Sequence, residues 1–194
     1  MCIRDSISCT YGAGGGNVGA NREVCQMIKN AGTTPVTHFT VIKNTKEGIK
    51  EQLDQYLADG VDHMLALRGD IPLGETTTCG DFDYATDLVK FVRDTYGDKF
   101  EIAVAGSPEG HISCRSLESD IAVLKQKQDN GADYIMTQLC WDMEQFKYWL
   151  DAIRKAGITM PVDVGVMPIL DQAATINMAL SRNGCVMDLS LIHI

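Results

Sequence analysis

Residues His63-Met64-Leu65-Ala66-Leu67-Arg68-Gly69-Asp70 form an apolar run that stops abruptly at a cation, a glycine and a carboxylate. A short run bounded in this way predicts a β-strand buried on both faces, because parallel strands covered by helices lose the polar alternation of half-exposed strands. Ligands bind at the carboxyl ends of parallel strands in open sheets and in barrels alike. Arg68, Gly69 and Asp70 are therefore candidate site residues.

The rest of the chain repeats one unit from Ile7 onward: a short apolar run, polar residues, an amphipathic stretch and then a glycine. This alternation predicts βα units. The expected strands are residues 7–10, 36–41, 63–67, 100–105, 134–139 and 162–166. The expected helices cover residues 18–30, a segment capped by Asn44 or Thr45 and ending at Gly60, and apolar stripes at 85–92, 117–124 and 146–153.

Six strands in unbroken βα order fit either a (β/α)8 TIM barrel that lacks two of its strands or a doubly wound sheet. Nearly every strand ends in side chains able to bind or react, and a barrel gathers all of them at one mouth, so the barrel is favoured. These side chains are Thr10, Tyr11, His38, Thr40, Arg68, Asp70, Glu109, His111 and Gln138.

One segment, Gly14-Gly15-Gly16-Asn17-Val18-Gly19, formally satisfies the dinucleotide-binding pattern G-x-G-x-x-G. The acidic residue expected at the end of the next strand is absent, since the chain reads Val36-Thr37-His38-Phe39-Thr40 there. We interpret the segment as a flexible glycine loop near a ligand.

The composition is that of a globular protein in the cytoplasm. The formal net charge of −9 argues against general binding to nucleic acid or acidic membranes, and no apolar run approaches the roughly 18 residues of a membrane span. Seven cysteines without a C-x-x-C motif indicate neither a disulfide framework nor a zinc site, and no metal site is predicted. We expect reduced, mostly buried thiols.

The two ends resemble translated sequencing-adaptor read-through, and ordinary frayed termini are the alternative. Residues 1–6 and 189–194 are therefore predicted to be non-native tails around a partial barrel at residues 7–188.

Several motifs, in order and at suitable spacing, resemble the bacterial type of the methylenetetrahydrofolate reductase family. They are Thr10-Tyr11-Gly12-Ala13-Gly14-Gly15, Thr37-His38-Phe39-Thr40, Leu65-Ala66-Leu67-Arg68-Gly69-Asp70, Pro108-Glu109-Gly110-His111, residues 125–133 and Thr137-Gln138. The resemblance implies a flavin-bearing TIM barrel of one-carbon metabolism and methionine biosynthesis, homo-oligomeric at full length. It also implies that NAD(P)H reduces FAD, which then reduces methylenetetrahydrofolate to methyltetrahydrofolate.

The resemblance implies FAD contacts at Tyr11, Ala13, His38, Arg68, Gly69, Asp70, Tyr84, Ala85, His111, Asp120 and Lys127. Arg68 and Lys127 can meet a diphosphate, His38 and His111 can donate to phosphate or ribityl oxygens, and Asp120 can bind sugar hydroxyls. It further implies that Asp70 and Gln138 are catalytic and that Thr10, Asp70 and Gln138 bind the folate.

Each assignment has a purely structural alternative. Lys127 and Asp120 can belong to a solvated helix face, and His38 can be a core histidine. Arg68 and Asp70 can form a surface ion pair with each other.

The chain also departs from the family pattern. Ser107 replaces an aromatic residue near the flavin, and Leu139-Cys140-Trp141-Asp142 replaces a pair of aromatics before the Asp. Ala174 and Met178 stand where a Gln and a Phe are usual, so no role is carried over to either. The family's proton-donating acid belongs to the first barrel strand, upstream of Ile7, and we expect this chain to lack it and to be inactive alone.

Two other functions remain open from the residues themselves. One is a folate-using or pterin-using barrel transferase without flavin, and the other is a non-catalytic flavin-binding or folate-binding protein.

Overall fold

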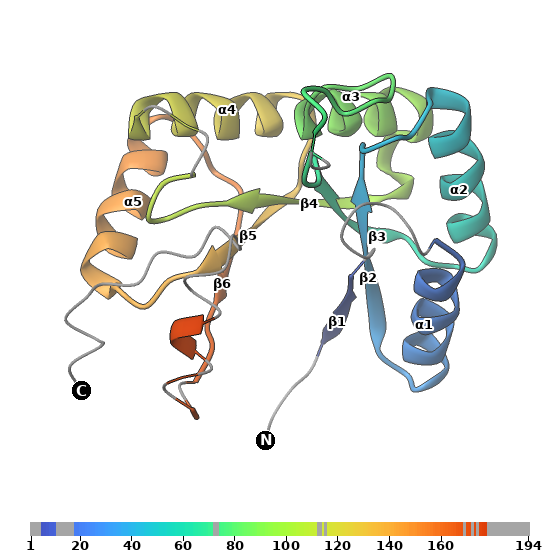
Figure 1. Cartoon of the computed structure of the whole chain (residues 1–194), viewed down its shortest axis with the longest axis horizontal. Coiled ribbons are helices and arrows are strands. Elements are labelled where there is room, and N and C mark those ends of the chain that lie inside the picture. Colours follow the sequence, from blue (N-terminus) through green and yellow to red (C-terminus); the bar gives the residue numbers. More distant parts are fainter. Residues whose placement is uncertain are drawn as a thin grey trace. The chain divides into compact units, whose positions relative to one another are not determined.

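The structure of the chain is a computed structural model that describes residues 5–10, 18–71, 74–111, 114, 116–168, 170–171, 173 and 175–177. Strands and helices alternate along it (Figure 1). They are β1 (Ser6–Cys9), α1 (Val18–Asn30), β2 (Thr34–Thr40), α2 (Lys46–Ala58), β3 (His63–Leu67), α3 (Ala85–Tyr96), the 3-10 helix η1 (Gly97–Lys99), β4 (Glu101–Gly106), α4 (Leu117–Asp129), β5 (Tyr134–Leu139), α5 (Met143–Lys155) and β6 (Val162–Gly165). Every predicted strand and helix is confirmed.

The strands follow one another in the sheet in chain order, β1-β2-β3-β4-β5-β6. The pairs β1–β2, β2–β3, β3–β4 and β5–β6 are parallel. A doubly wound sheet reverses its strand order at a switch point, whereas a (β/α)8 barrel adds each new strand beside the previous one. The unbroken order therefore excludes the doubly wound sheet and confirms the TIM-barrel class, of which this chain supplies six strands.

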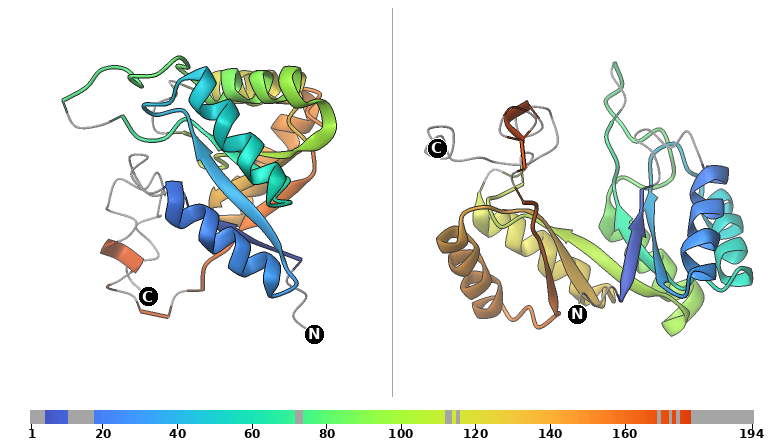
Figure 2. Two further views of the ribbon diagram at one scale, coloured as in Figure 1. Left: turned by 90° about the vertical axis from the view of Figure 1, so that its right-hand side faces the viewer. Right: turned by 90° about the horizontal axis from the view of Figure 1, so that it is seen from below.

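The chain divides into two compact units, residues 1–104 with 130–133 and residues 105–129 with 134–194. In the first unit, α1 and α2 lie on the same side of β1 and β2 (Figure 2). The ring of Phe39 on β2 meets the ring of Tyr56 on α2 edge to face, with centroids 6.5 Å apart. Side chains alternate along a strand, so Phe39 and Thr37 point to the helices while His38 and Thr40 point to the opposite face.

Helix α2 shows why the sequence folds locally as predicted. Ile49, Leu53 and Tyr56 recur at helical spacing and are all buried. Of the two predicted caps, Thr45 is the one used, since its side chain accepts a hydrogen bond of 3.1 Å from the backbone N–H of Gly48. A capping hydroxyl at this position satisfies one of the N–H groups that the first helical turn leaves without a partner.

The buried side chain of Asn21 on α1 links β1, β2 and α2. Its amide nitrogen donates to the carbonyl oxygens of Cys9 at 3.0 Å and Thr10 at 2.9 Å. Its amide oxygen accepts from the hydroxyls of Thr37 at 2.8 Å and Tyr56 at 2.7 Å. Asn21 is only 3% exposed, so these contacts satisfy polar groups that water does not reach. This one residue fixes where β1 ends.

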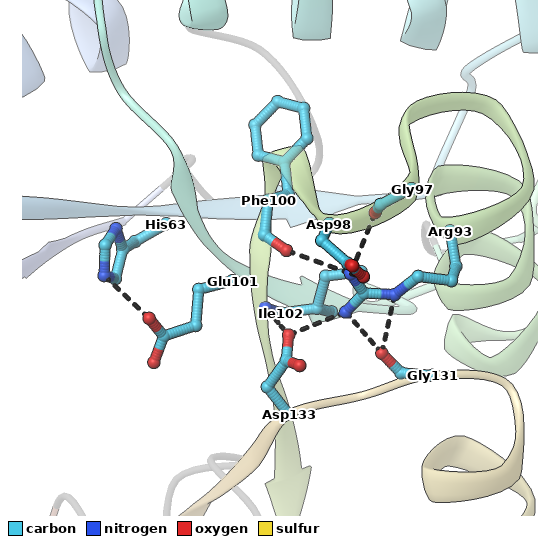
Figure 3. Close-up of polar contacts among 9 residues, drawn as sticks. All are labelled: His63, Arg93, Gly97, Asp98, Phe100, Glu101, Ile102, Gly131 and Asp133. Atoms are coloured by element: carbon cyan, nitrogen blue, oxygen red, sulfur yellow. Dashed lines mark hydrogen bonds and ion pairs between the residues drawn. The ribbon is translucent and has the colours of Figure 1, made fainter.

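The guanidinium of Arg93 on α3 links the α3–β4 connection to residues 130–133 (Figure 3). It donates to the carbonyl oxygens of Gly131 at 2.6 and 3.0 Å, Gly97 at 2.8 Å and Phe100 at 3.3 Å. It also pairs with the Asp133 carboxylate at 2.7 Å, which in turn accepts from the Ile102 N–H at 2.7 Å. The planar fork of an arginine suits several acceptors at once, and a lysine could not reproduce this set.

The second unit, which contains only the last two residues of β4, has its own core between β5 and α5. Phe146, Trp149 and Ile153 form the buried face of α5, whose N-cap, Asp142, accepts from two backbone N–H groups. Gly106 ends β4 against this core. An ideal Cβ at Gly106 would lie 2.6 Å from Ile135 Cγ2 and 3.2 Å from Trp149 Cζ2. No side chain fits there unless the core itself shrinks.

Among the described cysteines, Cys9, Cys25 and Cys140 are buried free thiols, Cys114 is half-buried and Cys79 is exposed. The expectation of mostly buried thiols is thus confirmed for these residues. Within the described part of the chain, no helix combines the length and apolar character that crossing a membrane requires.

Candidate functional site

The C-terminal half of β2 carries two polar groups with no partner. Among the described residues, the imidazole Nε2 of His38 and the hydroxyl Oγ1 of Thr40 are buried and form no hydrogen bond. Burial lowers the pKa of His38, so its imidazole is neutral near neutral pH. An unsatisfied buried polar atom costs free energy, and two of them on one strand face indicate a place where a ligand completes the bonding.

The end of β3 lies beside them. The register pairs His38 with Leu65 and Thr40 with Leu67, and the Val41 N–H donates to the Arg68 carbonyl at 3.2 Å. Gly69 has a φ of +85°, and an ideal Cβ there would lie 2.7 Å from Ile42 Cγ1 and 3.1 Å from Thr40 Cβ. Glycine is required on both counts, since the conformation is left-handed and the space is filled.

Arg68 is half-buried and Asp70 is exposed. Among the described residues, neither forms an ion pair within 4.0 Å. The purely structural alternative, a surface ion pair between Arg68 and Asp70, is therefore not formed in this structure. Both side chains remain available to a ligand at the carboxyl end of β3.

Three further predicted residues of the first unit lie near strand or helix ends. Thr10 directly follows β1, where Asn21 holds its carbonyl oxygen. Tyr84 precedes α3 with its side chain exposed, and its backbone N–H donates to the Asp87 carboxylate at 2.9 Å. Ala85 is the buried first residue of α3. Tyr84 and Ala85 thus stand at a helix N-terminus, where backbone N–H groups can meet an anion.

In the second unit, Lys127 and Asp120 lie on α4 and affect each other electrostatically. The Lys127 ammonium donates to the Ala105 carbonyl of β4 at 2.9 Å. Burial lowers the pKa of Lys127, and the Asp120 carboxylate opposes that effect. Both residues are half-buried. The alternative of a solvated helix face is wrong for Lys127, because its charged end points back to the protein.

Gln138 lies in an irregularity of β5. The β5–β6 register passes from Met136 opposite Asp163 to Leu139 opposite Gly165, so two residues of β5 face one of β6. The Thr137 hydroxyl accepts from the Gly165 N–H at 2.9 Å and holds this bulge. Bulges re-aim side chains and are common beside active sites. The Gln138 amide oxygen accepts from the backbone N–H of Leu139 at 2.9 Å, which holds this side chain against its own strand.

The loop after β4 carries His111. The Gly110 N–H donates to the Ser107 carbonyl at 2.9 Å, and the Gln145 side chain of α5 donates to the Pro108 carbonyl at 3.0 Å. The His111 side chain is exposed at the end of this braced turn.

Tyr11, Ala13, Ala174, Met178 and the glycine loop 14–17 lie outside the described residues, as do residues 1–4 and 178–194 of the two predicted tails. Within the described ranges, no group of three or more His, Cys, Asp or Glu side chains could hold a metal ion.

The first unit thus brings His38, Arg68, Gly69 and Asp70 to the ends of adjacent strands, and the second brings Lys127 and Asp120 together.

Sequence reasoning missed three polar residues. Asn21 gave no signal, since an Asn in a helix is ordinary. Thr137 belonged to the Thr137-Gln138 motif but received no role of its own. Thr40 was noted at a strand end but received no role.

A comparison with protein families matches the model described as Methylenetetrahydrofolate reductase over residues 3–183. Among curated proteins, the chain is 36% identical to methylenetetrahydrofolate reductase 2 of Saccharomyces cerevisiae, covering 89% of this chain and 30% of that protein. It is 34% identical to 5,10-methylenetetrahydrofolate reductase of Pectobacterium carotovorum, covering 84% of this chain and 53% of that protein. The chain therefore spans about a third to a half of these relatives' length.

Solved structures share the fold at low sequence identity. An oxaloacetate acetylhydrolase aligns with a TM-score of 0.55 at 13% identity, over 97% of this chain and 78% of that one. An uncharacterized protein from Clostridium thermocellum that binds two copies of 5-methyl-5,6,7,8-tetrahydrofolic acid aligns at 0.53 and 15% identity, over 97% of this chain and 73% of that one. At this identity the likeness is one of fold alone.

Proposed function

Because this chain belongs to the methylenetetrahydrofolate reductase family, we propose that it is part of an FAD-dependent enzyme that reduces methylenetetrahydrofolate to methyltetrahydrofolate with NAD(P)H. The family match supports the reaction. The names of relatives such as methylenetetrahydrofolate reductase (NADH) 1 of Arabidopsis thaliana support a pyridine nucleotide as reductant. The observation in this chain that carries the proposal is the pair of unsatisfied polar atoms at the end of β2, beside Arg68, Gly69 and Asp70.

The side-chain types at these positions are suited to binding FAD. Arg68 supplies a cation for a diphosphate, and the left-handed Gly69 lets a ligand approach the backbone. The neutral His38 imidazole, whose Nε2 lacks a partner among the described residues, can bond to a hydroxyl or carbonyl group. FAD, when bound, would supply the hydride-transfer chemistry that the protein's own side chains cannot perform.

The protein's own side chains would bind and orient the substrate and place charge near it. Asp70 can accept hydrogen bonds from the amino group of a pterin, and its negative charge disfavours further negative charge close by. The Gln138 amide nitrogen, in a side chain whose oxygen accepts from the Leu139 N–H at 2.9 Å, can donate a hydrogen bond to a folate. Hydride transfer requires the hydride donor and the hydride acceptor to be held close together in the right orientation, and such contacts provide this.

The test of this function uses a full-length family protein that carries these residues, because the chain covers only 53% of the bacterial relative. We expect a yellow protein with a flavin absorbance spectrum that forms methyltetrahydrofolate from methylenetetrahydrofolate and NAD(P)H. A colourless protein that binds folate without redox activity would instead favour a flavin-free transferase or a binding protein.

Replacing Asp70 by Asn should slow reduction of the folate while leaving reduction by NAD(P)H nearly unchanged. The change removes a charged acceptor worth roughly 1.5–3 kcal/mol, which corresponds to a loss of about tenfold or more in the folate step. The flavin reduction potential should also rise, because a nearby negative charge is lost. Stopped-flow measurement of the two half-reactions separately checks both.

The matched control is Glu75→Gln, which removes an exposed carboxylate from the same connection between β3 and α3. It should alter neither half-reaction. Equal slowing of both half-reactions in Asp70→Asn would assign Asp70 to loop structure instead of substrate binding.

A further inference from the structure

Thr40 is the most deeply buried member of the candidate site in the first unit, and no role has been assigned to it. The residue is 8% exposed, and its hydroxyl forms no hydrogen bond among the described residues. Thr37, three residues earlier on the same strand, has a hydroxyl with a hydrogen-bond partner, since it donates to the Asn21 side chain at 2.8 Å. The difference between the two is the strand face on which each lies.

The methyl group and the backbone carbonyl of Thr40 both contact neighbouring residues, whereas its hydroxyl has no hydrogen-bond partner among the described residues. Its Cβ and Cγ2 lie against Gly69, 3.1 and 3.4 Å from where a Cβ would stand. Its carbonyl oxygen accepts from the Asn44 side chain at 2.9 Å. The methyl and the backbone of Thr40 are therefore used in packing, and the hydroxyl alone is unexplained.

His38 lies two residues earlier on the same face, and its own buried Nε2 has no hydrogen-bond partner within the described part of the chain. A neutral imidazole and a hydroxyl can each donate or accept one hydrogen bond, and neither brings a charge. Such a pair suits a hydroxyl or a heterocyclic carbonyl or imide group. It suits a phosphate less well, since phosphates select cations and rows of N–H donors.

We propose that Thr40 is a cofactor-binding residue that, with His38, hydrogen-bonds the uncharged riboflavin half of FAD. This inference rests on the proposed function, and it deepens it by naming a further residue and the part of the cofactor that it meets. We expect the diphosphate to pair with the charged side chain of Arg68 instead.

The test is Thr40→Val in the full-length protein, because valine keeps the methyl that packs on Gly69 and removes only the hydroxyl. FAD should bind about three- to tenfold more weakly, the loss expected for one hydrogen bond. The FAD-free protein should unfold at an equal or higher denaturant concentration, since an unsatisfied buried hydroxyl has been removed. Riboflavin should lose affinity by the same factor as FAD, and ADP should lose none.

Thr37→Val is the matched control on the opposite face of the same strand. It removes a hydroxyl that has a partner, so it should lower the stability of the FAD-free protein and leave the FAD dissociation constant unchanged. A purely structural role for Thr40 would make the two variants behave alike.

The outcomes separate the two proposals. Unchanged FAD affinity in Thr40→Val, or a loss confined to ADP, overturns this inference while the reductase function stands. Failure of the unmodified protein to bind FAD at all overturns the proposed function, and this inference with it.

Discussion

Replacing Asn21 by Ala should lower the free energy of unfolding by about 3 kcal/mol or more, because it leaves several buried groups unsatisfied at once. The carbonyl oxygens of Cys9 and Thr10 lose their donor, and the hydroxyls of Thr37 and Tyr56 lose their acceptor. Urea denaturation followed by circular dichroism measures the change. We also expect weaker binding of the folate, since Asn21 holds the carbonyl of Thr10, a predicted folate-binding residue, at the end of β1.

The control is Asn30→Ala, the last residue of the same helix and an exposed one. An exposed polar side chain away from such networks changes stability by roughly 0.5 kcal/mol or less. If the two variants had similar midpoints, the Asn21 network would contribute little and β1 would be held by its strand pairing alone.

Arg93→Met should also be strongly destabilising, by about 2–3 kcal/mol, because its hydrogen bonds to three carbonyl oxygens and two carboxylates are lost together. The side chain is 19% exposed, so water replaces these bonds only in part. The Arg93 hydrogen bonds connect segments that are far apart in sequence. Their loss should therefore raise amide hydrogen exchange in residues 130–133 as well as in η1.

Lys90→Met provides the comparison on the same helix. Lys90 pairs with Asp94 at 2.8 Å, but both side chains are more than 60% exposed. Pairs of this kind contribute roughly 0.3–0.5 kcal/mol. Equal destabilisation by the two variants would contradict the role given to Arg93. Arg93→Lys, which keeps the charge without the fork, should recover only a minor part of the loss.

The fold could be predicted from the sequence because local and global signals agree in this chain. Buried apolar runs such as Met64 to Leu67 mark the strands, and the helices end at glycines such as Gly60 and Gly97. Even the competing doubly wound sheet was rejected for a valid reason, namely side chains that react at the end of nearly every strand. The boundaries of β1, β2, β4 and β6 differ from the predicted ones by one or two residues, because apolar runs mark burial while strand ends are set by backbone hydrogen bonds.

The site could be predicted only in part, for a physical reason. Residue types that carry charge or an imidazole, such as Arg68, Asp70 and Lys127, are visible in a sequence because they are costly to bury. Hydroxyls and amides are ordinary in any chain, and only a structure shows whether each has found a partner. Asn21 became noticeable only through the hydrogen bonds that it forms, and a role for Thr40 only through the bond that its hydroxyl lacks among the described residues.

Two of the tightly packed glycines, Gly106 and Gly69, have opposite consequences for how this sequence can diverge. Gly106 lacks a left-handed backbone, and its obstruction comes from the side chains of Ile135 and Trp149. A larger residue at 106 is accessible once position 135 has become smaller, so these two positions should covary. Gly69 offers no such route, because its φ of +85° strains any other L-residue even if Ile42 and Thr40 retreat. Position 106 can therefore change together with position 135, whereas the backbone conformation restricts position 69 to glycine.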